Sequence, residues 1–465
     1  MCLLFAMWFG SGIVMMYVEY PELTETERLS NLPALSLDTV IHTPLEASRS
    51  ISADSAFTEA RLTSVMGRPT YKFTTPNRDQ FFVFADSGEL LNTVYEEQAI
   101  EAVETSGFYQ SDIAPTHDGL VELDQWTLSA GLDRHRPLHR IKLNDTAGSV
   151  LYISSTSGQI VRDTNRNERF WNWLGSTLHW IYPAILRQNA SLWNDVIVYL
   201  SMLGIFSVFS GTIIGIMRIR IRNPYRGKDV SPYQGWMKWH HILGLFTLVF
   251  VSTFIFSGLM SMGPWGVFSS NVSAQEQITG YKGDPTIRLS ELSIPSVLNR
   301  HNSVKEIHWH QIQSQTYATE VYSTTESILT QTNDRDTKWL TDAIPNAIPA
   351  LIPAADLISL ERITTEDDYY YSRHNRYRPL PVYRAKFNDS NDSWFHIDAK
   401  NGEVLNRVDN ASRRERWLYN SLHSLDFQFL WQARPLWDIV VILLSLIGLG
   451  FSITSVVIGW RKLFN

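Results

Sequence analysis

The chain contains almost no cysteine, and its charge is not weighted towards lysine and arginine. Its 465 residues include a single cysteine, Cys2, which excludes disulfide frameworks, cysteine-based zinc sites and iron–sulfur clusters. Lysine and arginine number 40 against 47 aspartate and glutamate residues, and the net charge of −7 argues against a broad basic surface for nucleic acid. Any metal or redox chemistry must therefore use side chains other than cysteine, and nucleic acid is not an expected partner.

Charged residues are also missing from four long apolar runs. The mean hydropathy of −0.13 resembles that of a soluble protein, but it averages these runs against polar stretches. A helix needs about 20 apolar residues to cross the hydrocarbon core, and we predict transmembrane helices at 1–18, 196–217, 239–268 and 439–460. The first run is short enough for a signal peptide, but it lacks a basic start and a small-residue cleavage site. We expect no charge at mid-depth and no broken helix, which argues against a transporter.

Basic residues predict the orientation of these helices. Lysine and arginine are concentrated in the loop 218–238 and in the tail 461–465, so both ends of the chain are expected in the cytoplasm. The long stretches 19–165 and 269–409 then lie outside, in the periplasm of a bacterial inner-membrane protein. Interfacial segments are predicted at 166–195 and 410–438.

The chain also repeats itself. His179 falls on His423 at a shift of 244 residues (423 − 179), and Ser11-Gly12 falls on Ser257-Gly258 at a shift of 246. We therefore predict two parallel repeats, each with a helix, an outer domain, an interfacial segment and a second helix. The pair His240-His241 has no counterpart, because its partner would fall before Met1. We expect the natural chain to begin further upstream with another histidine. Further matches are Trp173 with Trp417, Trp193 with Trp437, Gly204 with Gly448 and Gly215 with Gly459.

Strand-like alternation followed by a glycine turn recurs between the predicted helices. Hairpins are expected at 69–84, 139–153 and 382–398, and the glycines that follow them need a positive φ. The last of these ends in Asp398-Ala-Lys-Asn-Gly402-Glu-Val. A helix, two strands and this ending resemble the PepSY module. Together with the apolar helices, nearly the whole chain resembles the PepSY-associated transmembrane family.

The resemblance implies an α+β membrane protein with four transmembrane α-helices in two parallel repeats, each with an extracytoplasmic α/antiparallel-β PepSY domain. Family members are typically linked to iron uptake, and some are haem-containing inner-membrane reductases of ferric siderophores. Others carry a fused flavin reductase domain, which this sequence lacks, as it lacks a dinucleotide glycine fingerprint. The resemblance thus implies a ferric siderophore or another iron complex as partner, and an electron donor that the sequence does not identify.

Four histidines are candidate axial ligands of b-type haem: His179, His423, His240 and His241. Imidazole is a common haem ligand, and ionisable residues at membrane depth are functional candidates by default. The length of the third helix, at 1.5 Å per residue, keeps His241 too far from His423 to share one iron. We therefore predict that His179 pairs with His423 across an outer haem. His240 or His241, with the deeper His241 favoured, would pair with the expected upstream histidine across an inner haem.

Two alternatives stay open. The histidines lie beside tryptophans such as Trp173 and Trp180, and could simply belong to the aromatic belt at the membrane surface. The protein could then be a membrane-anchored binding or regulatory protein that inhibits peptidases or senses a ligand, without enzyme activity. A second histidine pair, His308 and His310, shares one face of a predicted strand. It could bind a metal, but an exposed strand is the better interpretation.

Overall fold

The chain has α+β structure, as predicted, and folds into two compact units. We call them the helical unit, Met1–Pro21, Asn167–Ser269 and Ala411–Asn465, and the sheet unit, Glu22–Arg166 and Ser270–Asn410. The computed structural model describes residues 1–52, 56–270, 272–284, 286–294, 303–331, 340–373 and 376–464.

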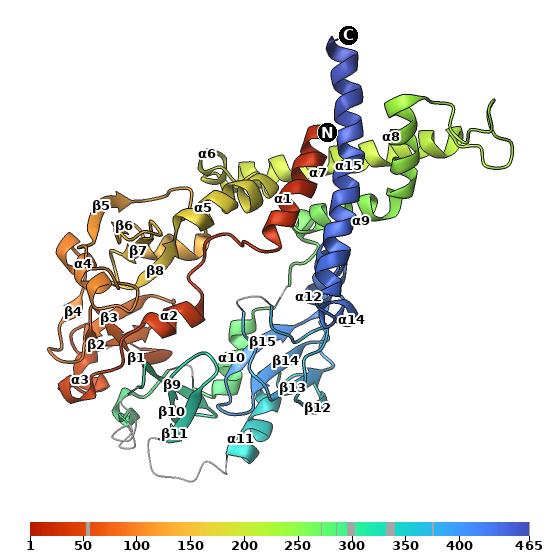
Figure 1. The fold of residues 1–465 in the computed structure, drawn as a ribbon. Helices are drawn as coiled ribbons and strands as arrows, with labels where there is room; N and C mark the ends of the chain where they lie inside the picture. Colours follow the sequence, from red (N-terminus) through yellow and green to blue (C-terminus); the bar gives the residue numbers. More distant parts are fainter. Residues whose placement is uncertain are drawn as a thin grey trace. The chain divides into compact units, whose positions relative to one another are not determined.

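Two long apolar helices dominate the helical unit (Figure 1). α7 (Ala190–Arg218) and α15 (Leu436–Phe464) have 29 residues each and are long enough to cross a bilayer. A third span results if α8 (Gly235–Phe246) and α9 (Leu248–Met260) count as one helix. α1 (Cys2–Met15) is apolar but has only 14 residues. By length and composition, the described residues thus contain two or three helices able to span a membrane, where the sequence predicted four.

The predicted span 239–268 is not a straight helix. α8 and α9 are bent by 70° at Thr247, whose φ of −85° and ψ of −4° interrupt the helix. The bend lets α8 pack against α15 while α9 packs against α7. The expectation of an unbroken helix is therefore wrong here, because packing against two different neighbours is not encoded in the apolarity of the run.

Glycine allows the helices to approach closely. A Cβ atom at Gly448 on α15 would lie 2.5 Å from Cζ of Phe9 on α1. A Cβ atom at Gly204 on α7 would lie 2.9 Å from Cδ1 of Ile255 on α9. Small residues commonly hold membrane helices together in this way. The shorter helices at or in this unit are α5 (Arg166–Asn172), α6 (Ala184–Arg187), η4 (Pro264–Gly266), α12 (Asn410–Glu415), α13 (Leu422–Ser424) and α14 (Gln428–Trp431).

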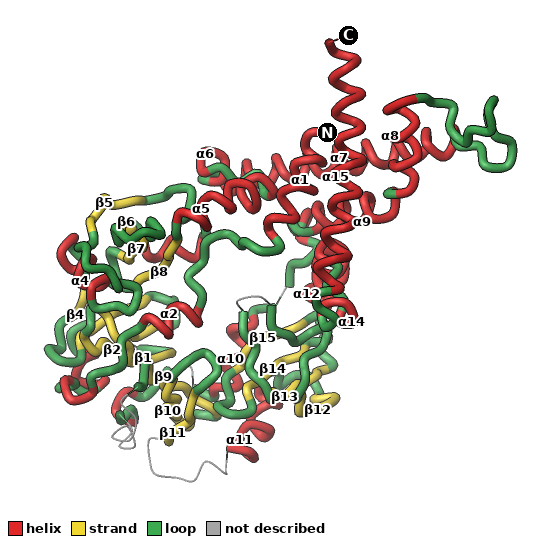
Figure 2. The backbone as a smooth tube through the Cα atoms, viewed as in Figure 1, coloured by secondary structure: helices red, strands yellow, loops and turns green. Residues whose placement is uncertain are grey.

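The sheet unit contains three antiparallel sheets (Figure 2). The largest has the strand order β11-β10-β9-β1-β2-β3-β4, and the two smaller sheets are β5-β6-β7-β8 and β12-β13-β14-β15. The three predicted hairpins are confirmed as β2–β3, β6–β7 and β13–β14. Gly88, Gly158 and Gly402 have φ values of +72°, +67° and +76°, also as predicted. The strands of the large sheet are β1 (Glu59–Val65), β2 (Arg68–Thr74), β3 (Gln80–Phe84), β4 (Leu90–Leu91), β9 (Glu306–Ile312), β10 (Gln315–Val321) and β11 (Ser327–Gln331). The others are β5 (Thr116–Val121), β6 (Leu138–Lys142), β7 (Val150–Ser154), β8 (Ile160–Thr164), β12 (Leu357–Ile363), β13 (Val382–Phe387), β14 (Trp394–Asp398) and β15 (Val404–Val408).

A helix precedes each small sheet and packs against it. α4 (Glu96–Glu104) buries Ala99 and Val103 against the sheet that contains β6 and β7. α11 (Leu340–Ala347) buries Ile344 in the core of the sheet that contains β13 and β14. The remaining helices of the unit are α2 (Glu25–Asn31), η1 (Leu37–Thr39), α3 (Pro44–Ser48), η2 (Ala130–His135), α10 (Ala274–Lys282), η5 (Leu289–Glu291) and η8 (Ile348–Leu351).

The central strand pair of the large sheet joins the two stretches that were predicted as separate outer domains. β1 pairs antiparallel with β9, with Leu62 opposite Ile307 and Arg61 opposite His308. Leu62 and Ile307 are fully buried in one shared core with Trp309. The large sheet and one of the hydrophobic cores therefore contain residues of both 19–165 and 269–409, so the two stretches are not independent domains.

Candidate functional site

His179 lies beside α1, and its ring is held through one nitrogen. It follows η3 (Trp173–Thr177), a π-helical turn of a kind that is frequent at functional sites. Its Nδ1 lies 3.1 Å from the carbonyl oxygen of Trp8 and 3.2 Å from Oγ of Ser11. The indole Nε1 of Trp8 donates in return to the backbone carbonyl of His179, at 2.9 Å. These contacts fix both the backbone and the ring of His179 against α1.

His423 has corresponding surroundings on α9. It follows η9 (Arg416–Ser421), which is also π-helical. Its Nδ1 lies 3.1 Å from Oγ of Ser257, and the carbonyl group of Phe254 accepts a further hydrogen bond from the ring. Phe254 and Ser257 lie 246 residues after Trp8 and Ser11 (254 − 8 and 257 − 11). The sequence analysis matched the two serines, at a shift of 246, but did not assign them to the histidines, which repeat at a shift of 244.

The hydrogen-bond partners determine which ring nitrogen carries the proton. A carbonyl oxygen only accepts, so Nδ1 of His179 must donate to Trp8. The hydroxyls of Ser11 and Ser257 donate to carbonyl groups four residues earlier, at 2.6 and 2.7 Å, so their oxygens can accept from the rings. Each Nε2 then keeps its lone pair, and neither has a hydrogen-bond partner among the residues that the structure describes. A neutral imidazole with Nδ1–H bonded to protein is the form in which histidine ligates a metal.

The two rings lie close together. The ring centroids of His179 and His423 are 6.0 Å apart, and the ring planes meet at 70°. A metal–imidazole bond is about 2 Å long and each nitrogen lies about 1 Å from its ring centre, so two imidazoles on opposite sides of one iron have centroids about 6 Å apart. The spacing, the protonation and the open Nε2 atoms therefore fit a pair of axial haem ligands.

The chain as a whole matches a known protein family. The model of the family described as the PepSY-associated TM region matches residues 2–462, nearly the whole chain. The chain belongs to this family. No curated protein matches it. The membership identifies a PepSY-associated membrane protein and, by itself, assigns no cofactor or substrate.

His240 and His241, the second candidate pair of this PepSY-associated chain, differ in their hydrogen bonds. His241 is 8% exposed, its Nε2 donates to the carbonyl of Gly215 at 2.9 Å, and its Nδ1 lies 2.8 Å from Oγ of Ser231. Both of its nitrogens are therefore occupied. His241 connects the middle of α8 to the end of α7, and it has no lone pair left for a metal.

His240 instead has the same type of contacts as His179 and His423. Its Nδ1 lies 3.0 Å from Oγ1 of Thr454, whose hydroxyl donates to the carbonyl of Phe451 at 2.6 Å. That carbonyl also accepts a hydrogen bond from His240, and the imidazole stacks on the Phe451 ring at 4.7 Å and 7°. An aromatic residue followed three positions later by serine or threonine thus receives Nδ1 in all three cases. Sequence reasoning favoured His241 by depth, whereas the hydrogen bonds favour His240.

In the remaining predicted pair, His308 and His310, both Nε2 atoms are bonded to other groups of the protein. His308 and His310 lie on β9, an inner strand of the large sheet, so the interpretation of this segment as an exposed strand is wrong. Nε2 of His308 bonds to Oε2 of Glu306 at 2.8 Å, and Nε2 of His310 bonds to the carbonyl of Asn401 at 2.9 Å. Within the described ranges, no group of three or more histidine, cysteine, aspartate or glutamate side chains is arranged around a common metal position.

Proposed function

We propose that this membrane protein holds a b-type haem between His179 and His423 and reduces a ferric siderophore or another iron complex during iron uptake. The observation that carries the proposal is the pair of neutral imidazoles, 6.0 Å apart, with both Nε2 atoms open. Haem bound there would supply one-electron transfer, by which one ferric ion becomes ferrous at the expense of a donor outside this chain. No general acid, base or nucleophile is required, so no catalytic side chain is assigned beyond the ligands.

The residues around His179 and His423 would determine the orientation, the basicity and the polarity of the surroundings of these two haem ligands. Hydrogen bonds from Nδ1–H to Ser11 and Ser257 orient the rings and raise the basicity of Nε2. The rings of Phe254 and Tyr419 lie 6.2 and 5.6 Å from that of His423 and supply an apolar lining. Such a lining keeps water away from a redox centre and influences its potential.

We further propose a four-span arrangement in the bacterial inner membrane. Residues 1–18, which contain α1, would form the fourth span, and the bent pair α8–α9 would form one span. The basic residues of 218–238 and of the end of α15 support cytoplasmic termini and a periplasmic sheet unit. The stretches 19–165 and 269–409, which share the large sheet, would then lie together in the periplasm.

For a second, inner haem we assign His240 as the ligand rather than His241. His240 is bonded through Nδ1, and its Nε2 has no hydrogen-bond partner in the described part of the chain. In His241 both nitrogens are already bonded.

The absorption spectrum of the full-length protein, purified in detergent from haem-replete cells, tests the proposal. We expect a Soret band that is lost or strongly reduced in His179→Ala and in His423→Ala. His42→Ala, in the sheet unit, is the control and should keep the band. Ser11→Ala and Ser257→Ala should retain haem but shift its midpoint potential, because the hydrogen bond to the ligand is removed.

Reduction of a ferric complex by the reduced protein completes the test. Loss of both haem and iron reduction in the two alanine variants supports the proposal. A wild-type protein without a Soret band, or variants that keep the band, would refute it and leave the non-enzymatic PepSY binding or regulatory role as the better hypothesis.

A further inference from the structure

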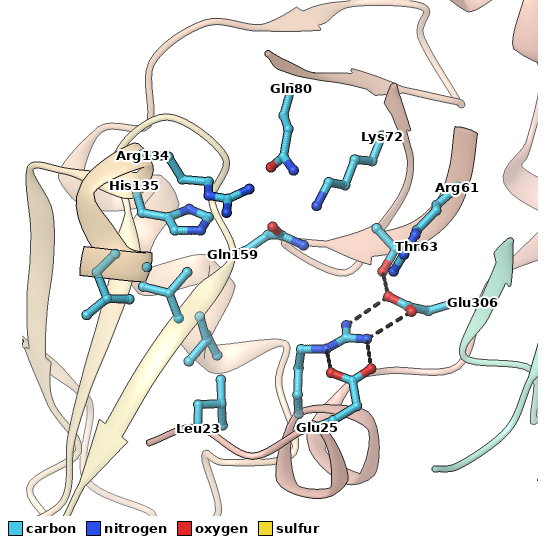
Figure 3. A pocket seen from close by; sticks show the side chains of 15 residues that line it. Leu23, Glu25, Arg61, Thr63, Lys72, Gln80, Arg134, His135, Gln159 and Glu306 are labelled. Atoms are coloured by element: carbon cyan, nitrogen blue, oxygen red, sulfur yellow. Dashed lines mark hydrogen bonds and ion pairs between the residues drawn. The ribbon is translucent and has the colours of Figure 1, made fainter. Parts of the chain in front are cut away.

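The sheet unit contains a polar cavity of about 320 Å³ between β1–β3 and the sheet of β5–β8 (Figure 3). Its walls are formed by α2, by the strands β1, β2 and β3, and by the η2 segment with the start of β8. In Figure 3 the side chains of Lys72, Gln80, Arg134 and Gln159 point into the same central space. We call it the cationic cavity, because arginine and lysine outnumber aspartate and glutamate in its lining.

Two cations stand directly opposite each other on neighbouring strands. Arg61 of β1 and Lys72 of β2 are cross-strand partners, and both side chains line the cavity. Like charges in this arrangement destabilise a sheet. Arg134, from η2, adds a third positive charge from the opposite wall. None of these three side chains forms an ion pair with any residue that the structure describes.

The two carboxylates of the lining do not neutralise Arg61, Lys72 and Arg134. Arg28 is bonded to both Glu25 and Glu306, with distances of 2.7 to 2.9 Å. The lining therefore carries four positive charges (Arg28, Arg61, Lys72 and Arg134) and two negative charges (Glu25 and Glu306), a balance of plus two.

The ionisation of the lining reflects this excess. Burial and the nearby Arg61 lower the pKa of Lys72 to about 8. Burial, with Arg134 and Lys72 as neighbours, lowers the pKa of His135 to about 4, so that this ring is neutral at pH 7. Both shifts are in the direction expected where positive charge is concentrated without a counter-charge.

We propose that the cationic cavity binds a small organic anion that carries about two negative charges on carboxylate or phosphate oxygens. Guanidinium groups bind such oxygens through paired hydrogen bonds. The amides of Gln80 and Gln159 can bind hydroxyl or carbonyl groups of the ligand, and Leu132 and Val161 provide an apolar wall for a carbon skeleton. The volume is at the lower end of the range for small-molecule sites. This site does not depend on whether the helical unit holds haem.

Only one half of the large sheet carries the charges. Counted from the two-residue turns, Arg61 and Lys72 of the β1–β2 hairpin correspond to His308 and Thr319 of the β9–β10 hairpin. Thr319 is uncharged, and His308 is bonded to Glu306. The sheet architecture therefore does not require these positive charges. Their presence in one hairpin alone favours a role in binding a ligand over a role in the structure.

Thermal unfolding of the full-length protein in detergent, with and without added anions, tests the proposal. The probes are citrate, glycerol 3-phosphate and uncharged glycerol, at millimolar concentration and low salt. We expect citrate or glycerol 3-phosphate to raise the Tm of the sheet unit and glycerol to have no effect. The stronger of the two anions identifies carboxylate or phosphate as the preferred group.

Lys72→Gln and Arg134→Gln should weaken binding of the preferred anion by about tenfold or more, because each removes a charged hydrogen bond. Without ligand, Lys72→Gln should keep or raise the Tm, because the repulsion from Arg61 disappears. This opposite response separates a binding role from a purely structural one. Lys400→Gln, an exposed lysine in the same unit, is the control. Equal binding by the Lys72 and control variants, or no response to either anion, would overturn the proposal.

Discussion

Replacing Arg28 with methionine removes the cation that faces a carboxylate held inside the sheet unit. Glu306 on β9 is 2% exposed, and it accepts two hydrogen bonds from Arg28 of α2, at 2.8 and 2.9 Å. Thr63 of β1 donates a third, at 2.7 Å, and His308 a fourth, at 2.8 Å. Burial alone would raise the pKa of Glu306, but the bonds from His308 and Arg28 hold it well below its usual value. The carboxylate is thus charged, buried and dependent on its partners.

Breaking a buried ion pair by removing one partner costs about 3 to 5 kcal/mol, because the other charge stays buried. Glu306 keeps Thr63 and His308, so we expect a loss near the lower limit, about 3 kcal/mol. Replacing both members, in Arg28→Met with Glu306→Leu, should cost less than Arg28→Met alone. The exposed pair Arg288–Glu291 offers a matched control, since Arg288→Met should cost less than about 1 kcal/mol.

Hydrogen exchange of the β9 amides, followed by mass spectrometry on the full-length protein in detergent, measures the opening free energy locally. A loss of 3 kcal/mol corresponds to exchange that is faster by about two orders of magnitude. The deficit of Arg28→Met should also shrink as the pH falls, because burial without Arg28 raises the pKa of Glu306 and protonation then removes the buried charge. A change of only a few-fold, or a double variant whose loss is the sum of the single losses, would refute this reasoning.

Two further predictions concern other parts of the chain. Burial and the nearby Arg384 lower the pKa of His396 to about 3, and burial lowers that of His135 to about 4. The folded state thus binds fewer protons than the unfolded state below pH about 6.5, so the stability of the sheet unit is complete above that pH and falls on acidification, by about 1.4 kcal/mol per pH unit for His396. A Tm that is constant from pH 7 to pH 5 would contradict this. In the helical unit, Gly448→Ala should cost about 1 to 3 kcal/mol, because the new Cβ atom would lie 2.5 Å from the Phe9 ring. Phe9→Ala should partly restore the Tm of that variant, and an unchanged Tm for Gly448→Ala alone would show that the helices move apart freely.

Local signals in the sequence predicted the local structure well. Alternating apolar residues and a following glycine predicted the hairpins β2–β3, β6–β7 and β13–β14. Both signals lie within about twenty residues of sequence, because the paired strands are neighbours along the chain. The repeat also aligned His179 with His423, which lie together in the structure.

Contacts between residues far apart in the chain could not be predicted from the sequence in the same way. The pairing of β1 with β9 joins residues that are 245 positions apart (307 − 62), so no local turn specifies it. The bend at Thr247 follows from packing against two different helices. Which ring nitrogens of His240 and His241 are bonded depends on the carbonyl and hydroxyl groups that meet them, and these belong to α7, α15 and the loop before α8.

The pairing of β1 with β9 has a consequence for biosynthesis. Leu62 leaves the ribosome long before its partner Ile307 exists. At about 5 to 20 residues per second, the 245 residues between them take about 12 to 50 s to translate. During that time one edge of the β1–β4 sheet has no strand beside it, while α7, α8 and α9 are being made. An unpaired edge attracts other strands, so the nascent chain must be shielded until its second half arrives.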